Sequence, residues 1–320
     1  MAPMEVAVTA ELPGDALDRL AMRARVRVRH ERARLDPEGL ARFIGTADAA
    51  VTLLADPVTA GVFERCPALK IVANYAVGVD NIDLEEARKR GVWVSNTPDV
   101  LTNATADLTW TLILSLTRRV LEGDELVRSG RFAGWRPDLL LGRGLEGKTL
   151  GIIGYGRIGR AVAKRGRAFG MKIATLARHE RTSPEPFVRF LPLEELLVVS
   201  EVLSLHCPLT SETWHLLDEA RLRMLPEGAF VINTARGPVL DEAALARVLS
   251  DGHLGGAGLD VYEHEPDVDP ELLQRNDVVL MPHAGSATVE TRSAMADLAV
   301  ANVEAVLDGR EPPSVVVRGR

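Results

Sequence analysis

The stretch Lys148-Thr-Leu-Gly-Ile-Ile-Gly154-Tyr-Gly156-Arg-Ile-Gly159 decides the fold of this 320-residue chain. Its first half is an apolar run typical of a buried strand, and residues 160–169 continue in a helical pattern that ends at Gly170. A strand, a tight turn and a helix form the context that a Gly-x-Gly-x-x-Gly dinucleotide fingerprint requires. The glycines permit the turn, the approach of a pyrophosphate and close helix packing, and amides at the helix start face phosphate. We therefore predict a dinucleotide site at Gly154, Tyr155, Gly156, Arg157, Ile158 and Gly159.

Short apolar runs alternate with helical patterns on both sides of this turn, which indicates βαβ units and parallel sheets. Before the turn we predict strands over residues 5–9, 49–54, 71–74 and 93–95. From the turn onward we predict six more, over 149–153, 172–177, 202–205, 229–233, 256–261 and 278–281. Helical patterns over 103–120 and 288–307 flank the second series. The fold class is therefore α/β.

Turn chemistry at Asn96-Thr-Pro-Asp99 marks a crossing between two domains. We expect two doubly wound parallel-sheet domains, the larger a Rossmann dinucleotide-binding domain over residues 100–286. The smaller is expected to be flavodoxin-like, to bind substrate, and to be discontinuous, because the last helix should return to it. Its predicted residues are 1–99 and 287–320.

Composition excludes several classes of protein. The net charge of −7 argues against a general nucleic-acid-binding surface. No apolar run reaches the roughly 18 residues that a membrane span needs. The two cysteines, Cys66 and Cys207, form neither a disulfide framework nor a metal-binding pattern. We expect a cytoplasmic protein with no nucleic-acid partner, no membrane partner and no metal.

The end of the second strand of the Rossmann domain bears on which nucleotide binds. An NAD site usually carries Asp or Glu there, for the ribose 2′-hydroxyl. Here Ala177 occupies that place and Arg178 follows it, so a 2′-phosphate meets a guanidinium and no carboxylate. Glu180 is close enough in sequence to reach a ribose. We therefore favour NADP as the cofactor and leave NAD open.

Three later segments place polar side chains at the carboxyl ends of strands, where open α/β sheets bind ligands. They contribute Arg236, Glu265 and His283. Reduction of a ketone needs a proton donor beside the carbonyl oxygen, which suits His283, and a nearby Glu265 favours its imidazolium form. Arg236 can bind a substrate carboxylate and polarise the adjacent carbonyl. Each residue alone also has a structural interpretation, as a surface Arg, a loop acid or a helix cap, and their joint occurrence favours catalysis.

These motifs resemble those of the D-isomer-specific 2-hydroxyacid dehydrogenases, most closely the glyoxylate/hydroxypyruvate reductases. The resemblance runs nearly end to end. It includes Asn74-Tyr-Ala-Val-Gly-Val-Asp-Asn-Ile-Asp83, Asn96-Thr-Pro-Asp-Val-Leu101, the glycine turn, His206-Cys-Pro-Leu-Thr210 and the three catalytic segments.

The resemblance implies the catalytic trio Arg236, Glu265 and His283. It implies substrate contacts from Leu54, the backbone amides of Val77 and Gly78, Arg236, His283, and Trp135 supplied across a homodimer interface around residues 104–131. The segments around His179 and around Trp135 are shorter than in similar reductases. Besides the glycine turn, the implied cofactor contacts are Ala177, Arg178, His179, Cys207, Pro208, Thr213, Thr234, Ala235, Arg236, Asp260, His283, Ala284 and Gly285.

The activity that the resemblance implies is NADPH-dependent reduction of glyoxylate and hydroxypyruvate to D-2-hydroxy acids. A broad-range 2-keto acid reductase, acting for example on 2-ketogluconate, is the main alternative. Glu265 disfavours a formate dehydrogenase, which carries Gln there, and the lack of Lys near Val77 disfavours a phosphite dehydrogenase. A cofactor-sensing binding protein need not keep the catalytic trio, so its presence disfavours that class.

Overall fold

The computed structural model describes residues 4–176 and 185–320. The chain forms two compact units, which are described separately. The first consists of residues 1–101 and 286–320, and the second of residues 102–285. None of the helices in the described part of the chain combines the length and apolarity needed to cross a membrane.

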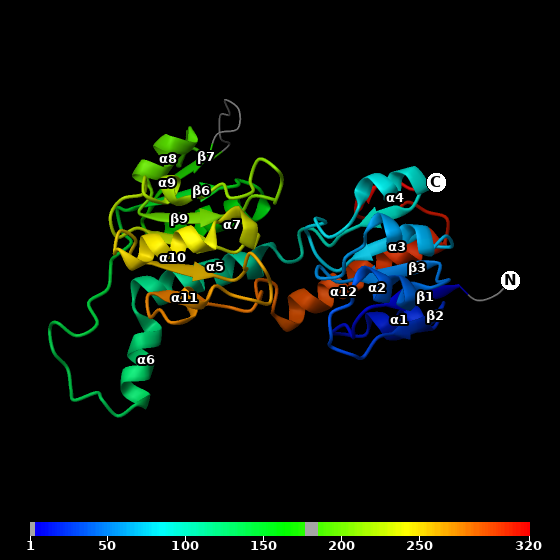
Figure 1. Ribbon diagram of the computed structural model, residues 1–320, viewed down its shortest axis with the longest axis horizontal. Coiled ribbons are helices and arrows are strands. Elements are labelled where there is room, and N and C mark those ends of the chain that lie inside the picture. Colours follow the sequence, from blue (N-terminus) through cyan, green and yellow to red (C-terminus); the bar gives the residue numbers. More distant parts are fainter. Residues whose placement is uncertain (1–3, 177–184) are drawn as a thin grey trace. The chain divides into compact units, whose positions relative to one another are not determined.

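The first unit contains a six-stranded sheet in the order β13-β5-β4-β3-β1-β2 (Figure 1). All neighbours are parallel except β13, which pairs antiparallel with β5. The order of the first five strands, β2-β1-β3-β4-β5, is that of flavodoxin-like folds. The strands are β1 (Glu5–Val8), β2 (Arg25–Val28), β3 (Ala49–Thr52), β4 (Ile71–Asn74), β5 (Trp93–Ser95) and β13 (Val315–Val317).

Helices cover both faces of this sheet. Leu40, Phe63 and Ala87, from three successive helices, pack with strand residues in one buried cluster. The opposite face is covered by α12 together with α1. Asp36, Asp83 and Thr288 cap the starts of α2, α4 and α12 through their side-chain oxygens. The helices are α1 (Ala16–Ala21), α2 (Pro37–Ile44), α3 (Ala60–Arg65), α4 (Leu84–Arg90) and α12 (Val289–Leu307).

The second unit contains a seven-stranded parallel sheet in the order β12-β11-β10-β9-β6-β7-β8. Read from the other edge, β8-β7-β6-β9-β10-β11 is the Rossmann order, and β12 is added beyond β11. The direction of winding reverses between β6 and β9. The strands are β6 (Thr149–Ile153), β7 (Lys172–Leu176), β8 (Val188–Leu191), β9 (Val202–Leu205), β10 (Phe230–Asn233), β11 (Gly256–Leu259) and β12 (Val278–Leu280).

Two apolar clusters lie on opposite faces of this sheet. One includes Trp110 and Val162, from the adjacent helices α5 and α7, and the other includes Leu196, Leu222 and Leu245 from α8, α9 and α10. The helices are α5 (Thr102–Thr117), α6 (Val120–Arg128), α7 (Arg157–Ala168), α8 (Leu193–Val199), α9 (Glu219–Leu222), α10 (Glu242–Ser250) and α11 (Pro270–Leu273), with a 3-10 turn over Gly237–Val239.

The predicted fold class is confirmed, with three differences in detail. Strand β2 was not among the predicted strand ranges. Strand β8 was not predicted, because its four residues alternate weakly and sit at the sheet edge. The carboxyl-terminal residues, for which no strand was predicted, add β13 to the first sheet.

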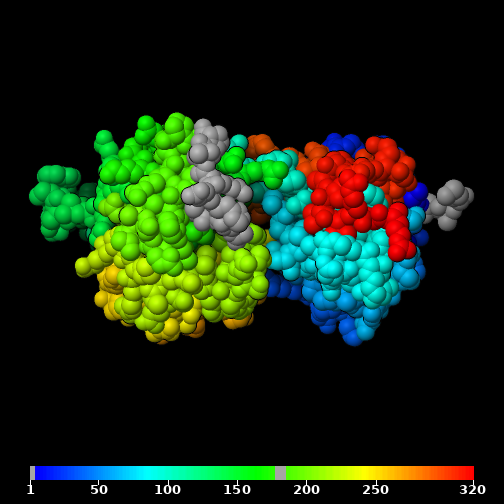
Figure 2. All heavy atoms as spheres, turned by 90° about the horizontal axis from the view of Figure 1, so that it is seen from above, coloured from blue at the N-terminus to red at the C-terminus, as the bar shows by residue number. Residues whose placement is uncertain are grey.

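Helix α6 and the first part of the segment after it are exposed, whereas Arg143, Leu145 and Lys148 at the end of that segment pack against the second unit. None of the side chains of α6 is buried, and residues 129–148 form no helix or strand. This segment protrudes from the body of the unit (Figures 1 and 2). Its exposed apolar side chains, together with those of α6, are Val120, Leu121, Val127, Phe132, Trp135 and Leu141.

Candidate active site

The glycine turn between β6 and α7 places two backbones in direct contact. Gly154 has φ +102°, and a Cβ atom there would lie 2.4 Å from the carbonyl carbon of His206. A Cβ atom on Gly159 would lie 2.2 Å from the carbonyl oxygen of Gly154. Neither position therefore accepts a side chain without movement of the backbone.

Gly156 differs from its two neighbours in the motif, because a Cβ atom there would meet nothing within 4 Å. It is the N-cap of α7, and no side chain caps that helix. The start of α7 thus has space beside Gly156 and no side-chain cap, and a helix start of this kind binds phosphate. This cradle fits the pyrophosphate of a dinucleotide.

Tyr155 is joined to the segment that precedes β8. Its hydroxyl group donates to Glu185, and the guanidinium of Arg160 lies 5.5 Å from its ring centroid. The predicted cofactor residues Ala177, Arg178 and His179 lie outside the described residues.

The loop after β9 carries Cys207, Pro208 and Thr213. Thr213 is buried, and its hydroxyl donates to the carbonyl of Pro208 at 2.7 Å while accepting from the amide of Thr210 at 2.8 Å. The Thr213 hydroxyl thus stabilises the conformation of this loop.

His206 belongs to a chain of hydrogen bonds beneath the glycine turn. The Thr109 hydroxyl donates to the Thr105 carbonyl at 2.8 Å and contacts the Thr234 hydroxyl at 2.9 Å. Because each hydroxyl has one proton, Thr234 donates to Thr109 and accepts from Nδ1 of His206, 3.5 Å away. Burial lowers the pKa of His206 to about 3, so the ring is neutral and its Nε2 accepts from Ser204 at 2.8 Å.

Arg236 follows β10 in a turn that Asn233 shapes. The Asn233 amide nitrogen donates to the Arg236 carbonyl at 2.9 Å, and its oxygen accepts from the Ala235 amide at 3.0 Å. A Cβ atom on Gly237 would lie 1.9 Å from the carbonyl of Tyr262, so this turn packs directly against the loop after β11. The half-buried Arg236 side chain donates from Nη1 to the Ala235 carbonyl at 2.8 Å.

His283, after β12, meets Glu265, from the loop after β11. Nδ1 of His283 lies 3.1 Å from both carboxylate oxygens of Glu265. The two side chains keep 26% and 22% of their surface exposed, so the pair is accessible to a ligand. Burial by itself raises the pKa of Glu265, but the hydrogen bond and charge of His283 outweigh it and lower that pKa overall. The carboxylate therefore stays ionised beside the imidazole.

Asp260 fixes the backbone that carries His283. Its carbonyl accepts from the amide of His283 at 2.8 Å, and its carboxylate accepts from Ala284 at 2.6 Å and Gly285 at 2.8 Å. Three bonds thus hold His283 at φ +54°, in the left-handed region that non-glycine residues rarely adopt. Burial raises the pKa of Asp260 despite these donors.

A family model for the "D-isomer specific 2-hydroxyacid dehydrogenase, NAD binding domain" matches residues 110–285. A glyoxylate reductase of Thermococcus onnurineus is 44% identical over 320 residues, covering 98% of this chain and 96% of its own length. The chain belongs to the D-isomer-specific 2-hydroxyacid dehydrogenases. It is an NAD(P)-dependent oxidoreductase.

Two solved structures share the fold of this dehydrogenase. A protein of Thermus thermophilus superposes with a TM-score of 0.93 at 48% identity, covering 98% of this chain and 100% of that one. An NADPH-dependent glyoxylate/hydroxypyruvate reductase of Sinorhizobium meliloti, in complex with NADP and malonate, has a TM-score of 0.86 at 34% identity. That comparison covers 100% of this chain and 99% of the other.

The substrate residues expected in the first unit of the dehydrogenase follow neighbouring strands. Leu54 comes after β3, and Val77 and Gly78 come after β4; all three are partly exposed. Trp135 lies on the protruding segment of the second unit and is 81% exposed.

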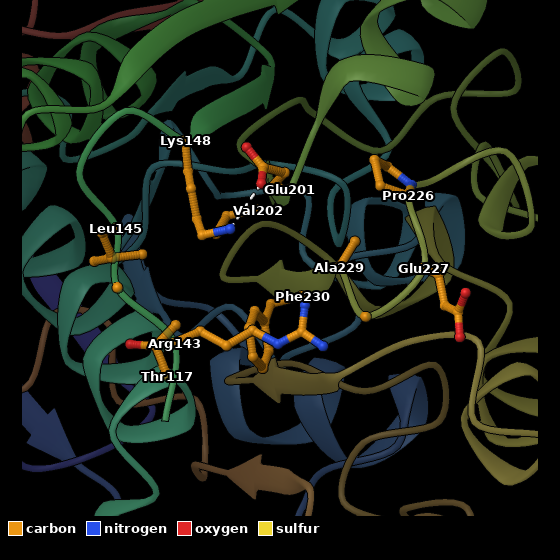
Figure 3. A pocket seen from close by; sticks show the side chains of 12 residues that line it. Thr117, Arg143, Leu145, Lys148, Glu201, Val202, Pro226, Glu227, Ala229 and Phe230 are labelled. Atoms are coloured by element: carbon orange, nitrogen blue, oxygen red, sulfur yellow. Dashed lines mark hydrogen bonds and ion pairs between the residues drawn. The ribbon is translucent and has the colours of Figure 1, made fainter. Parts of the chain in front are cut away.

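A separate hollow of about 50 Å³ lies at the amino ends of strands β6, β9 and β10, away from the carboxyl ends that carry the candidate site (Figure 3). There Nζ of Lys148 lies 2.8 Å from Glu201, which also accepts from the Thr149 amide at 3.0 Å. Arg143 lies over the ring of Phe230. The Lys148–Glu201 ion pair joins the starts of two strands, and nothing in the hollow resembles the dinucleotide cradle.

Sequence patterns gave no role to several polar residues that shape this site. Asn233 hydrogen-bonds the carbonyl of Arg236 in the turn after β10. Thr234, in the same turn, bonds both His206 and Thr109 of α5. The signal available was an Asn or His directly after a buried strand, which is too common to be selective by itself.

We expect Gly156→Ala to weaken nucleotide binding and Gly159→Ala to lower thermal stability. The Gly156→Ala side chain meets no protein atom, so the melting temperature stays within a degree or two while the Kd for NADPH rises about tenfold, or about 1.4 kcal/mol. Gly159→Ala forces the turn apart and lowers the melting temperature. Fluorescence titration and thermal unfolding separate the two. Unchanged NADPH affinity in Gly156→Ala would contradict the cradle.

Proposed function

We propose that this dehydrogenase reduces small 2-keto acids, glyoxylate and hydroxypyruvate foremost, to D-2-hydroxy acids, with His283 as proton donor. The Glu265–His283 pair carries the proposal. Nδ1 of His283 faces the carboxylate, while Nε2 has no hydrogen-bond partner among the residues at 4–176 and 185–320. An imidazolium held in this way presents its Nε2 proton to a ligand and donates its Nδ1 proton in a hydrogen bond to the Glu265 carboxylate.

When bound, the nicotinamide supplies the hydride. His283 gives its Nε2 proton to the oxygen that becomes the product hydroxyl, and the ionised Glu265 stabilises the positive charge of the ring before the transfer. Asp260 keeps the ring in place, since it bonds three consecutive amides at His283, Ala284 and Gly285.

Arg236 is proposed to hold the substrate carboxylate and polarise the keto oxygen, because a guanidinium binds both as a fork of donors. The backbone amides of Val77 and Gly78 are proposed to bind the same carboxylate, and Leu54 to limit the size of the substrate side chain. These assignments favour short 2-keto acids.

NADP is the proposed cofactor. The absence of an acidic residue at Ala177 and the presence of Arg178 support it, and the Sinorhizobium meliloti relative is described as NADPH-dependent. The loops after β9, β10 and β12 are proposed to contact it around the cradle. The contact residues proposed are Tyr155, Arg157, Ile158, Ala177, Arg178, His179, Cys207, Pro208, Thr213, Thr234, Ala235, Arg236, Asp260, His283, Ala284 and Gly285.

A panel of glyoxylate, hydroxypyruvate, pyruvate and 2-ketogluconate, each with NADPH and NADH, tests the proposed substrate and cofactor. We expect the highest kcat/KM for glyoxylate or hydroxypyruvate with NADPH. A higher value for 2-ketogluconate would favour the broad-range reductase. A tenfold preference for NADH, about 1.4 kcal/mol, would overturn the choice of NADP.

Two substitutions test the proton donor. His283→Ala should lower kcat by roughly 10²–10⁴-fold and leave NADPH affinity unchanged, since proton transfer contributes about that much. Glu265→Gln removes the carboxylate that accepts from Nδ1 of His283, so kcat should fall while NADPH affinity stays unchanged. His253→Ala, at a histidine outside the strand-end loops, is the matched control. Full turnover in His283→Ala would exclude this mechanism.

We also propose that the enzyme is a homodimer joined through α6 and the protruding segment, with Trp135 contributed to the partner's substrate site. The exposed apolar side chains of this region support the proposal. Light scattering should give twice the 34.7 kDa chain mass. Val127→Glu should shift the protein toward monomer, whereas Met22→Glu, at an apolar position of the first unit that is more exposed still, should not. A monomeric wild-type protein would refute it.

A further inference from the structure

The loop after β4 has three consecutive carbonyl groups that are all hydrogen-bonded. The carbonyl of Ala76 accepts from the amide of Thr97 at 2.8 Å. That of Val77 accepts from Nδ2 of Asn96 at 2.7 Å, and that of Gly78 accepts from Nδ2 of Asn74 at 2.9 Å. Every one of these donors lies at the end of β4 or just after β5.

Fixing a carbonyl also fixes the amide of the next residue. In a trans peptide the C=O and N–H bonds point in opposite directions, and the planar bond keeps them so. Among the described residues only the Glu265–Pro266 bond is cis, so the peptides of this loop are trans. The amides of Val77, Gly78 and Val79 therefore point away from Thr97, Asn96 and Asn74.

These three amides are available to a ligand. The carbonyls of the loop have protein partners, but its amides at residues 77–79 donate to no atom in the described part of the chain. Val77, Gly78 and Val79 are each half-buried, so a small anion can reach them. Unpaired neighbouring amides of this kind bind carboxylates and other anions.

The two asparagine side chains are themselves held in one orientation. Oδ1 of the fully buried Asn74 accepts from the Thr52 hydroxyl at 3.1 Å, so its Nδ2 must face Gly78. Asn74 Nδ2 also bonds Asn81 at 3.1 Å, and Asn81 bonds the carbonyls of Leu53 at 3.1 Å and Asp56 at 2.9 Å. The loop after β3, which carries Leu54, is thereby joined to the loop after β4.

Asn96 is anchored from a different direction. Its carbonyl accepts from the Ser314 hydroxyl at 2.6 Å and from Nδ2 of Asn302 on α12 at 3.4 Å. The Ser314 amide in turn donates to Asn302 at 3.0 Å. The segment that leads into β13 thus holds the residue that orients the Val77–Gly78 peptide.

We propose that Asn96 and Asn74 are positioning residues that aim the amides of Val77, Gly78 and Val79 at the carboxylate of the substrate. The inference rests on the proposed function, which supplies the carboxylate. The two asparagines act on substrate affinity through the peptide planes and contact neither the hydride nor the proton in transfer.

Asn96→Ala is the first test, because Val77 is half-buried and water can replace the lost donor while the peptide is free to rotate. We expect the KM for glyoxylate and the Ki of oxalate to rise about tenfold. The KM for the nicotinamide cofactor and the melting temperature should stay the same, and kcat should change less than threefold. A role in folding alone would move the melting temperature and leave KM and Ki in place.

Tyr75→Phe is the matched control, because it removes a 2.6 Å bond to the Arg292 carbonyl from the same loop without touching the three peptides. Asn96→Leu keeps the number and branching of the side-chain heavy atoms if the alanine variant is unstable. Active Asn96 variants with the KM and Ki of Tyr75→Phe would overturn the inference and leave the proposed function intact.

Oxalate binding to the wild-type protein separates the two proposals. In a ¹H–¹⁵N spectrum the Gly78 amide should shift on addition of oxalate with oxidised cofactor. An unshifted Gly78 amide overturns the inference whatever the variants do. A wild-type protein that reduces no 2-keto acid overturns the proposed function, and the oxalate titration still reports on the amides.

Discussion

Contact between two backbones, with no room for a side chain, is the constraint on which the nucleotide-binding unit depends. Gly154 lies against His206, and Gly237 lies against Tyr262. Each contact joins loops that follow different strands, β6 with β9 and β10 with β11. The sheet sets the spacing of the strand ends, but these contacts set how closely the loops pack. The cradle above Gly156 and the turn that carries Arg236 both result from that packing.

Charge is distributed unevenly over the same edge of the sheet. Asp260 is buried and bonded to backbone amides, whereas Glu265 is bonded to an imidazole that a ligand can reach. Two carboxylates after one strand thus have opposite shifts of pKa, upward for Asp260 and downward for Glu265. Asp260 fixes the conformation of the loop that carries His283, and Glu265 accepts a hydrogen bond from the His283 ring. Such separation of neighbouring acids is common where one must stay ionised for chemistry.

The architecture was predictable from sequence because its signals are local. The glycines of the turn stand in a fixed pattern, and buried strands such as Thr149–Ile153 are continuous apolar runs. The short edge strand β8 has neither feature, and β13 depends on a partner over 200 residues earlier in the chain. The same difference applies to the site. Arg236, Glu265 and His283 were identified as candidates because each ends a strand segment, and the structure brings Glu265 and His283 together. The hydrogen bonds of Asn74 and Asn96 to the loop after β4 were not predictable, because they depend on which carbonyls of that loop face the two side chains.

The hydrogen-bond chain through His206 has a consequence for how the enzyme responds to acid. Burial lowers the pKa of His206 to about 3, so its ring is neutral at neutral pH. From Ser204 to Thr105 every proton has one donor and one acceptor, so the chain is a fixed dipole beneath the nucleotide. His206 therefore gains no charge when the pH falls through the range in which a histidine of ordinary pKa is protonated, and the hydrogen-bond chain keeps its direction beneath the cofactor turn.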